Sequence, residues 1–150
     1  MDLAQTSYST PTKKMLYKST VVCVTNQRQC ERLIKAGRII ANLSKTMLTV
    51  ISVVNPEISD TDTAALEYLF EVSKQNNAVM ALEYSKDPLA CIGEFIRTNE
   101  AQNVVTGMRE GQNSILPKLW TNFKSATFFT VTLNGEVHRP DAAAPVLILE

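Results

Sequence analysis

The stretch that decides the fold lies near the start of the chain, at residues 20–30, and reads Thr-Val-Val-Cys-Val-Thr-Asn-Gln-Arg-Gln-Cys. Residues 20–24 form a continuous apolar run rich in β-branched residues, which is typical of a strand covered on both faces. Asn26 and Gln29 then have the spacing of a capping box, and apolar residues recur at helical spacing to about residue 43. A buried strand followed at once by an amphipathic helix indicates an α/β protein.

The same alternation of strand and helix repeats along the rest of the chain. Asn55-Pro56 ends the second strand, because proline cannot donate to a ladder. Asp87 followed by Pro88 indicates a cap with proline at the first helical position. The pattern predicts an α/β, doubly wound, parallel sheet with helices on both faces and right-handed crossovers. Further strands are predicted at 47–54, 78–82, 103–107 and 127–133, and further helices at about 61–75, 88–96 and 114–124.

The two ends of the chain differ from this central domain, which we place at residues 19–134. Residues 1–18 are predicted to be a flexible N-terminal segment. Asn134-Gly135 is the strongest short signal for a hairpin turn, so the fifth strand is expected to fold back onto residues 136–138. We interpret residues 135–150 as a C-terminal hairpin and tail, which adds an edge strand either within the chain or across a dimer.

Composition and charge exclude several classes of protein. A chain of 150 residues with 45% hydrophobic and 20% charged residues fits one globular domain. Its net charge of zero argues against a dedicated nucleic-acid binder. The sequence has neither an apolar run of the ~18 residues that span a membrane nor a signal peptide, so a cytoplasmic protein is expected. Cys23, Cys30 and Cys91 lack C-x-x-C spacing, and we interpret them as reduced core residues.

The residues that most enzymes need are scarce in this sequence. The one histidine, His138, lies in a predicted turn near the end of the chain, so neither a hydrolase triad nor a metal site is expected. The glycine patterns of P-loops and of dinucleotide-binding domains are absent. We therefore predict that the protein is not an enzyme and has no catalytic or metal-ligating residues.

The remaining candidate is the loop after the fourth predicted strand, residues 107–114, which reads Gly-Met-Arg-Glu-Gly-Gln-Asn-Ser. A glycine at a strand end lets the backbone approach a phosphate closely, and the amides at the start of the next helix offer donors to an anion. Arg109 adds charge-assisted bonds. Many α/β domains have a glycine here for turn geometry only, so a purely structural loop is the alternative. Ligands of doubly wound sheets bind at the carboxyl ends of the strands, beside the switch point.

The order of five strands and four helices, the Val-Val-Thr-Gly at residues 104–107 and the long loop after it resemble the universal stress protein family over about residues 20–133. Residues 26–43, with Glu-Arg-Leu-Ile at 31–34, resemble the branch found in osmosensitive potassium-channel sensor histidine kinases. The resemblance implies a sheet of order 3-2-1-4-5 and a homodimer that uses the edge of the fifth strand. It also implies a regulatory module that senses a small ligand in stress or potassium and osmotic signalling, through a signalling protein partner.

Members of the family that bind ATP carry an aspartate at the end of the first strand and a G-x2-G-x9-G-[ST] loop after the fourth. In this chain Thr25 stands at the aspartate position, and the loop matches only at Gly107 and Thr121. Glu110 and Trp120 stand where the inner glycines belong, with Gly111 one place after the first of them. These departures argue against ATP hydrolysis and against the usual mode of ATP binding. The expected ligand is an adenine nucleotide (ATP or AMP) or a cyclic dinucleotide, contacted by Thr25, Asn26, Val53, Gly107, Arg109, Gly111, Ser114 and Thr121.

Two alternative functions belong to other classes of protein. A purely structural dimerisation or interaction domain would result if the Trp120 side chain filled the cleft beside Gly107. The second alternative is an enzyme of the wider adenine-nucleotide-binding α/β group. Residues 25–28, Thr-Asn-Gln-Arg, carry neither the paired-histidine signature nor the Ser-Gly-Gly loop of such enzymes. The apolar edge of the fifth strand is covered either by a second copy or by the chain's own residues 146–149; the residues of that edge are Phe128, Phe129, Val131 and Leu133.

Overall fold

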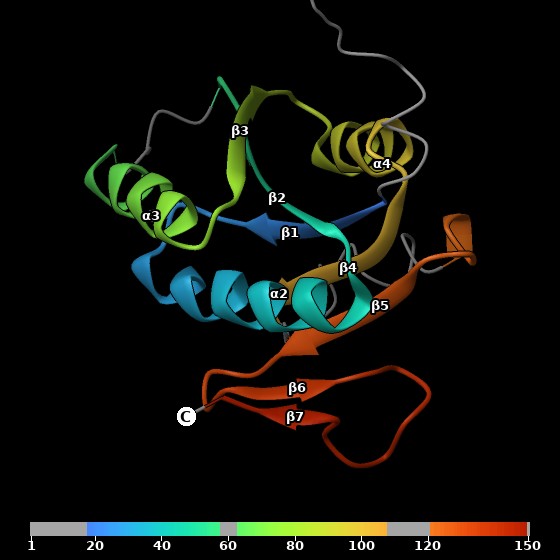
Figure 1. Ribbon diagram of the computed structural model, residues 1–150. Helices are drawn as coiled ribbons and strands as arrows, with labels where there is room; N and C mark the ends of the chain where they lie inside the picture. Colours follow the sequence, from blue (N-terminus) through green and yellow to red (C-terminus); the bar gives the residue numbers. More distant parts are fainter. Residues whose placement is uncertain (1–17, 58–62, 108–120, 150) are drawn as a thin grey trace, which may run out of the picture.

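The computed structural model describes residues 18–57, 63–107 and 121–149 (Figure 1). Within these ranges seven strands form one sheet, in the order β3-β2-β1-β4-β5-β6-β7. The expected α/β class and the order 3-2-1-4-5 are confirmed, and two further strands extend the sheet. The strands are β1 (Ser19–Val24), β2 (Met47–Val54), β3 (Val79–Tyr84), β4 (Ala101–Gly107), β5 (Thr127–Val131), β6 (Glu136–His138) and β7 (Leu147–Ile148).

The first five strands pair in parallel, and β6 and β7 pair antiparallel. The helical elements are η1 (Arg28–Cys30), α2 (Glu31–Ser44), α3 (Thr63–Gln75) and α4 (Pro88–Thr98). Asp87 caps α4 by accepting a hydrogen bond from the Ala90 backbone N–H at 3.1 Å, as its sequence predicts. Most of the helix predicted at residues 114–124 lies outside the described residues, as does the predicted N-terminal segment apart from Lys18.

The helix does not begin where the predicted capping box at Asn26 and Gln29 places it. The chain leaves β1 into a short 3-10 turn, η1, and α2 begins only at Glu31. Gln27, which precedes η1, and Cys30, which precedes α2, make no side-chain capping bond. The single turn of 3-10 helix therefore takes the place of the first turn that the spacing predicted.

Helices cover both faces of the sheet, which creates two cores. We call these the α2-side core, to which α3 also contributes, and the α4-side core (Figure 1). Side chains of neighbouring strand residues alternate between them, because successive residues of a strand point to opposite faces. The α2-side core includes Val22, Val24, Leu33, Ile34, Val50, Leu69, Val105, Val131 and Val137. The α4-side core includes Val21, Ile51, Ile92, Ile96, Val104 and Phe128.

The C-terminal hairpin changes the expected edge of the sheet. β6 pairs with the second half of β5, through Val131 and Val137, and β7 pairs with β6 in turn. The expectation that the edge of the fifth strand is open to a second copy is therefore wrong for this half of β5, because the chain itself occupies it. Leu147 and Leu149 pack against the α2-side core, whereas Ile148 is exposed.

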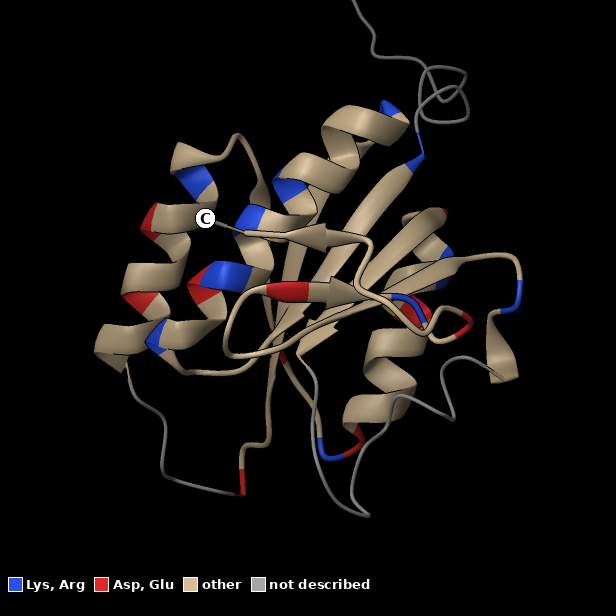
Figure 2. Ribbon diagram, turned by 90° about the horizontal axis from the view of Figure 1, so that it is seen from below, with Lys and Arg blue, Asp and Glu red and all other residues tan. Residues whose placement is uncertain are grey.

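No helix in the described ranges has both the length and the apolar character that a membrane span requires. The three cysteines are free thiols; Cys30 is buried, and Cys23 and Cys91 are partly buried. Figure 2 shows basic and acidic residues interspersed over the helices in that view. The absence of a nucleic-acid partner stays a prediction.

Candidate ligand site at the carboxyl ends of the strands

The strand order reverses between β1 and β4. From β1 the chain moves outward through β2 and β3 on one side, with α2 and α3 on one face, and then returns to β4 by way of α4 on the other face. In a doubly wound sheet this switch point is where the connections diverge and leave a crevice above the carboxyl ends. The register places Val24 opposite Ser52 and Val22 opposite Val105. The carboxyl ends of β1, β2 and β4 therefore lie at one end of the sheet.

Three predicted site residues lie at this end. Thr25 directly follows β1; it is exposed, and its Oγ1 lies 3.4 Å from Cys30 Sγ at the end of η1. Asn26 comes next and is partly buried. Val53 is the penultimate residue of β2 and packs against the α4-side core. Together they offer a hydroxyl, an amide and an apolar surface beside the switch point.

Gly107 is the last residue of β4, and neither packing nor backbone strain among the described residues demands a glycine there. A Cβ atom at this position would lie 3.5 Å from Arg32 Nη2 and 3.8 Å from Leu33 Cδ1, which are ordinary contacts. Gly135, in the hairpin turn, is the described glycine with a positive φ, at 86°. The backbone at Gly107 is thus bordered by Arg32 and Leu33 without being crowded by them, and a glycine there lets another group approach closely.

The remaining predicted residues are not brought to this end by any described contact. Arg109, Gly111 and Ser114, together with Glu110 and Trp120, lie outside the described residues. Thr121 is described and exposed. Its neighbours Asn122 and Phe123 line a cavity of about 380 Å³ along α4, together with Asp87, Leu89, Ala90, Gly93, Glu94 and Arg97.

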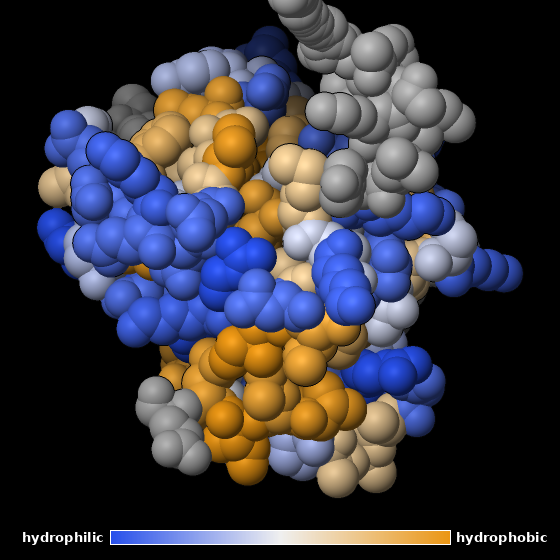
Figure 3. All heavy atoms as spheres, in the orientation of Figure 1, coloured by the Kyte–Doolittle hydropathy of each residue, from blue (hydrophilic) through white to orange (hydrophobic). Residues whose placement is uncertain are grey.

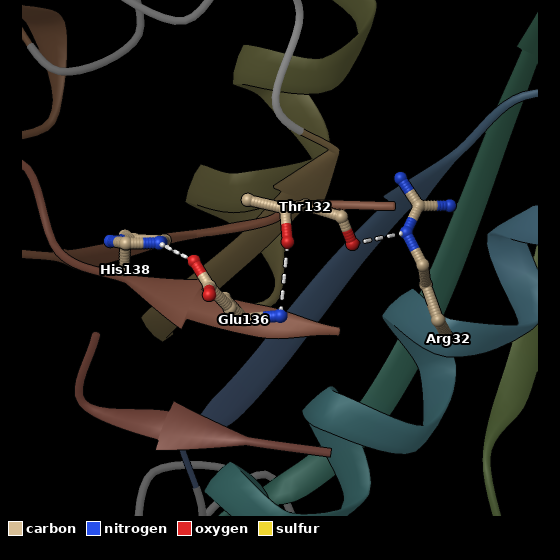
Figure 4. Close-up of polar contacts among 4 residues, drawn as sticks. All are labelled: Arg32, Thr132, Glu136 and His138. Carbon is tan, nitrogen blue, oxygen red and sulfur yellow. Dashed lines mark hydrogen bonds and ion pairs between the residues drawn. The ribbon is translucent and has the colours of Figure 1, made fainter. Parts of the chain in front are cut away.

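Arg32 is a residue of this region that the sequence did not indicate; its guanidinium spans from α2 to the carboxyl end of β5. Its Nε donates to the Thr132 carbonyl at 2.8 Å, Nη1 to the Gln29 carbonyl at 2.7 Å and Nη2 to the Val131 carbonyl at 3.4 Å. Figure 4 shows that Thr132 in turn accepts a hydrogen bond at its Oγ1 from the Glu136 backbone N–H. The cation is held by neutral carbonyls, and in the described part of the chain it forms no ion pair.

Thr106 is the second residue that sequence reasoning missed. It is 91% buried, since only 9% of its surface is exposed, and its hydroxyl has no hydrogen-bond partner among the described residues. Val104, two residues earlier, belongs to the α4-side core, so Thr106 faces the same side, one residue before β4 ends. A buried hydroxyl without a partner costs stability, and such a group is commonly satisfied by a ligand or a water.

No protein-family model matches the chain, and no curated protein matches it by sequence. Solved structures do match its backbone. A universal stress protein from Archaeoglobus fulgidus matches with a TM-score of 0.58 and 17% identity, over 81% of this chain and 96% of its own. The fold is that of the universal stress proteins.

Two further structures with the universal stress fold were solved with nucleotides bound. One is a universal stress protein in complex with cAMP, which matches with a TM-score of 0.58 and 16% identity over 78% of this chain and 98% of its own. The other is the universal stress protein from Archaeoglobus fulgidus in complex with dAMP, with a TM-score of 0.55 and 19% identity over 79% of this chain and 98% of its own. The present chain adds two strands, β6 and β7, to the strand order 3-2-1-4-5 of this fold.

The chemistry that the described residues offer at the switch point of the universal stress fold is that of binding. The side chains near the ends of β1 and β4 carry hydroxyl, amide and guanidinium groups, which donate and accept hydrogen bonds. His138 lies on β6, where its Nε2 is 3.1 Å from Glu136 Oε1 (Figure 4). In the order of the sheet, β5 lies between β6 and β4. No group of three or more His, Cys, Asp or Glu that could hold a metal occurs in the described ranges.

Sequence signals for the two missed residues differ in strength. Helical periodicity placed Arg32 on the outer face of its helix, and nothing local indicates that it reaches carbonyls 100 positions later. Thr106 had a weak signal, because it is a polar residue that follows two valines and directly precedes a glycine.

Proposed function

We propose that this chain is a non-catalytic regulatory module of the universal stress type that binds an adenine nucleotide at the carboxyl ends of β1 and β4. One observation carries the proposal: among the described residues at the switch point, nothing in the packing requires a glycine at position 107, and the buried Thr106 hydroxyl has no hydrogen-bond partner. Both features are explained if a ligand approaches the end of β4. Structures of the same fold in complex with cAMP and dAMP support the choice of an adenine nucleotide.

In this proposal each described residue has a role set by its chemistry. Val53 gives apolar surface to the base, and Thr25 and Asn26 hydrogen-bond to the ribose. Gly107 lets the sugar and phosphate approach the backbone. A cyclic dinucleotide has the same base, ribose and phosphate groups and is the second ligand of this class to test.

We further propose that the module acts in the cytoplasm and passes its signal to a protein partner in stress or potassium and osmotic signalling. Support for this finer role comes from the resemblance of residues 26–43 to the sensor-kinase branch. The test of the role is whether a ligand-dependent partner is recovered with the purified protein, and whether loss of ligand binding removes that dependence.

Thermal unfolding with and without ligand tests the proposed binding. A ligand that binds only the folded state adds about 2.7 kcal/mol at 100 times its dissociation constant. For a chain of this size, that is a rise in Tm of several degrees. We expect this rise with one or more of AMP, cAMP, ATP and a cyclic dinucleotide. If none of them changes the Tm, the nucleotide proposal is wrong.

Two variants locate the binding. Gly107→Trp puts an indole at the end of β4, beside Arg32 and Leu33, and we expect the ligand-induced rise to disappear. Leu43→Trp adds the same side chain at an exposed position, 78% accessible, at the opposite end of α2, and should leave the rise intact. Equal responses of the two variants would place the ligand elsewhere.

The C-terminal hairpin favours a second candidate function, as a homodimerisation or interaction domain. Leu133, Val146 and Ile148 are exposed there, and Figure 3 shows apolar surface gathered below the hydrophilic surface of α2, over the hairpin. Light scattering would give a dimer mass for the wild type and a monomer mass for Ile148→Lys. Leu43→Lys, which changes an exposed apolar residue elsewhere, is the control. A monomeric wild type would remove this candidate.

A further inference from the structure

We propose that Arg32 binds the phosphate of the ligand and so gives the site its preference for a charged nucleotide over a nucleoside. This inference rests on the proposed ligand site and adds a specificity-determining residue to it. It is carried by the position of the guanidinium, by the hydrogen bonds that it already makes, and by the charges around it.

The guanidinium lies beside the end of β4. A Cβ at Gly107 would be 3.5 Å from Arg32 Nη2, so a group that approaches the backbone at Gly107 also approaches this nitrogen. Gly107 and Arg32 lie on the α2 side of β4, and Thr106 lies on the α4 side. The cation and the unpartnered hydroxyl therefore flank the same strand end.

Arginine has five N–H donors, and the three carbonyl bonds of Arg32 use one on Nε, one on Nη1 and one on Nη2. One donor on each terminal nitrogen therefore has no acceptor among the described residues. Two N–H groups on adjacent nitrogens form the fork that binds two phosphate oxygens side by side. The three carbonyl bonds hold the fork in place, so little side-chain entropy is lost when an anion binds.

The local electrostatics favour an anion at this fork. Arg32 is the second residue of α2, where the partial positive charge of the helix amino terminus disfavours a cation. The nearby acid, Glu31, is engaged elsewhere: it accepts a hydrogen bond from the Tyr68 hydroxyl at 2.6 Å and forms an ion pair with Lys35 at 3.1 Å. An anionic ligand would balance both the guanidinium and the helix end.

Isothermal titration of adenosine and AMP, which differ by the phosphate, tests the proposal. We expect the wild type to bind AMP at least about tenfold more tightly than adenosine, as charge-assisted hydrogen bonds imply. Arg32→Gln should remove this preference and leave the affinity for adenosine unchanged. Arg32→Lys keeps the charge but loses the fork, so its preference should be about threefold or less.

Arg38→Gln is the matched control. Arg38 is on the same helix and also donates to a backbone carbonyl, that of Asn76, at 2.6 Å. The Arg38→Gln variant loses the same charge, but at a position away from the carboxyl ends of the strands. It should therefore keep the wild-type preference for AMP. If Arg32→Gln does not fold by circular dichroism, the comparison of Arg32→Lys with Arg38→Gln decides.

Inorganic phosphate, titrated separately and followed by amide shifts of Gly107 and Leu33, distinguishes the two proposals. If AMP and adenosine bind the wild type equally, or Arg32→Gln keeps the preference, the role of Arg32 is overturned and the nucleotide site stands. If neither binds but phosphate shifts these amides in the wild type and not in Arg32→Gln, the proposed function fails and the anion site stands. If nothing binds, both are wrong.

Discussion

Gly37 of α2 packs directly against Val22 of β1. A Cβ atom at Gly37 would lie 2.5 Å from Val22 Cγ2 and 3.0 Å from Leu48 Cδ1. Real atoms do not approach so closely, so the absence of a side chain at Gly37 sets how near α2 lies to the sheet. That distance in turn positions the amino-terminal turn of α2, which carries Arg32.

We expect Gly37→Ala to destabilise the fold. Overpacking costs about 1–3 kcal/mol, which outweighs the gain of about 0.8–1.0 kcal/mol in helix propensity. Gly93→Ala is the control, because a Cβ there would lie 3.4 Å from the nearest atoms, those of the Phe123 ring, and the propensity gain should remain. Urea unfolding of both variants checks this. Equal effects of the two changes would contradict the close contact at Gly37.

Thr106→Val should stabilise the ligand-free protein. Burying an unsatisfied polar group costs about 1–3 kcal/mol, and valine has the same shape without the hydroxyl. Thr20→Val is the matched change in a neighbouring strand. It should destabilise by about 1–2 kcal/mol, because the buried Thr20 hydroxyl is 2.6 Å from Thr46 Oγ1 and accepts from Asn103 Nδ2 at 3.0 Å. Urea unfolding of both variants should give shifts of opposite sign, and a loss of stability in Thr106→Val would mean that its hydroxyl is satisfied.

Stability should depend on pH through Glu31 and Tyr68. The hydrogen bond from Tyr68 lowers the pKa of Glu31 below its ordinary value, and the same bond raises the pKa of Tyr68. The bond needs an ionised Glu31 and a protonated Tyr68. Its contribution is therefore present above the ordinary carboxyl pKa and lost as the pH falls through the lowered value; it is lost again as the pH rises through the raised pKa of Tyr68.

Tyr68→Phe tests this dependence. We expect a lower Tm than the wild type near pH 7, and no difference between the two proteins at a pH well below the carboxyl range. Tyr84→Phe, at an exposed position, should match the wild type across this range. A Tyr68→Phe deficit that persists unchanged in acid would show that the ring packing, and not the bond to Glu31, is responsible.

Cys23 should resist alkylation in the folded protein. Burial raises the pKa of its thiol from 9.0 to about 12, which lowers the thiolate fraction about a thousandfold at a pH below both values. The thiolate is the reactive form. Iodoacetamide labelling near pH 8, read by mass spectrometry, should leave Cys23 unmodified in the native protein and label it in urea. Rapid native labelling would show that this side chain reaches solvent.

The strand and helix pattern was predictable because it depends on local periodicity. The buried runs 20–24 and 47–54 and the cap at Asp87 lie close to where the structure places their elements. The hairpin was also visible in Asn134-Gly135, since an αL-compatible turn is a local property, and Gly135 has a φ of 86°. The start of α2 was misplaced because the chain enters this helix through a 3-10 turn at Arg28–Cys30, and the spacing of Asn26 and Gln29 does not distinguish a 3-10 turn from the first turn of an α-helix.

The candidate site was predictable only in its location. Topology alone places Thr25, Val53 and Gly107 at one end of the sheet. The part played by Arg32 depends on a contact between residues 100 positions apart, and no periodicity reveals such a pair. A second copy at the edge of β5 conflicts with the hairpin that Asn134-Gly135 predicts, and in the structure β6 occupies part of that edge through the pairing of Val131 with Val137.

The anchoring of Arg32 also has a consequence during synthesis. Two of the three carbonyls that hold its guanidinium belong to Val131 and Thr132, which leave the ribosome about 100 residues after Arg32. A nascent chain can therefore form β1, α2 and β2 while this side chain still lacks two of its anchors. The guanidinium can therefore make all three carbonyl bonds only after the residues at the end of β5 have been synthesised.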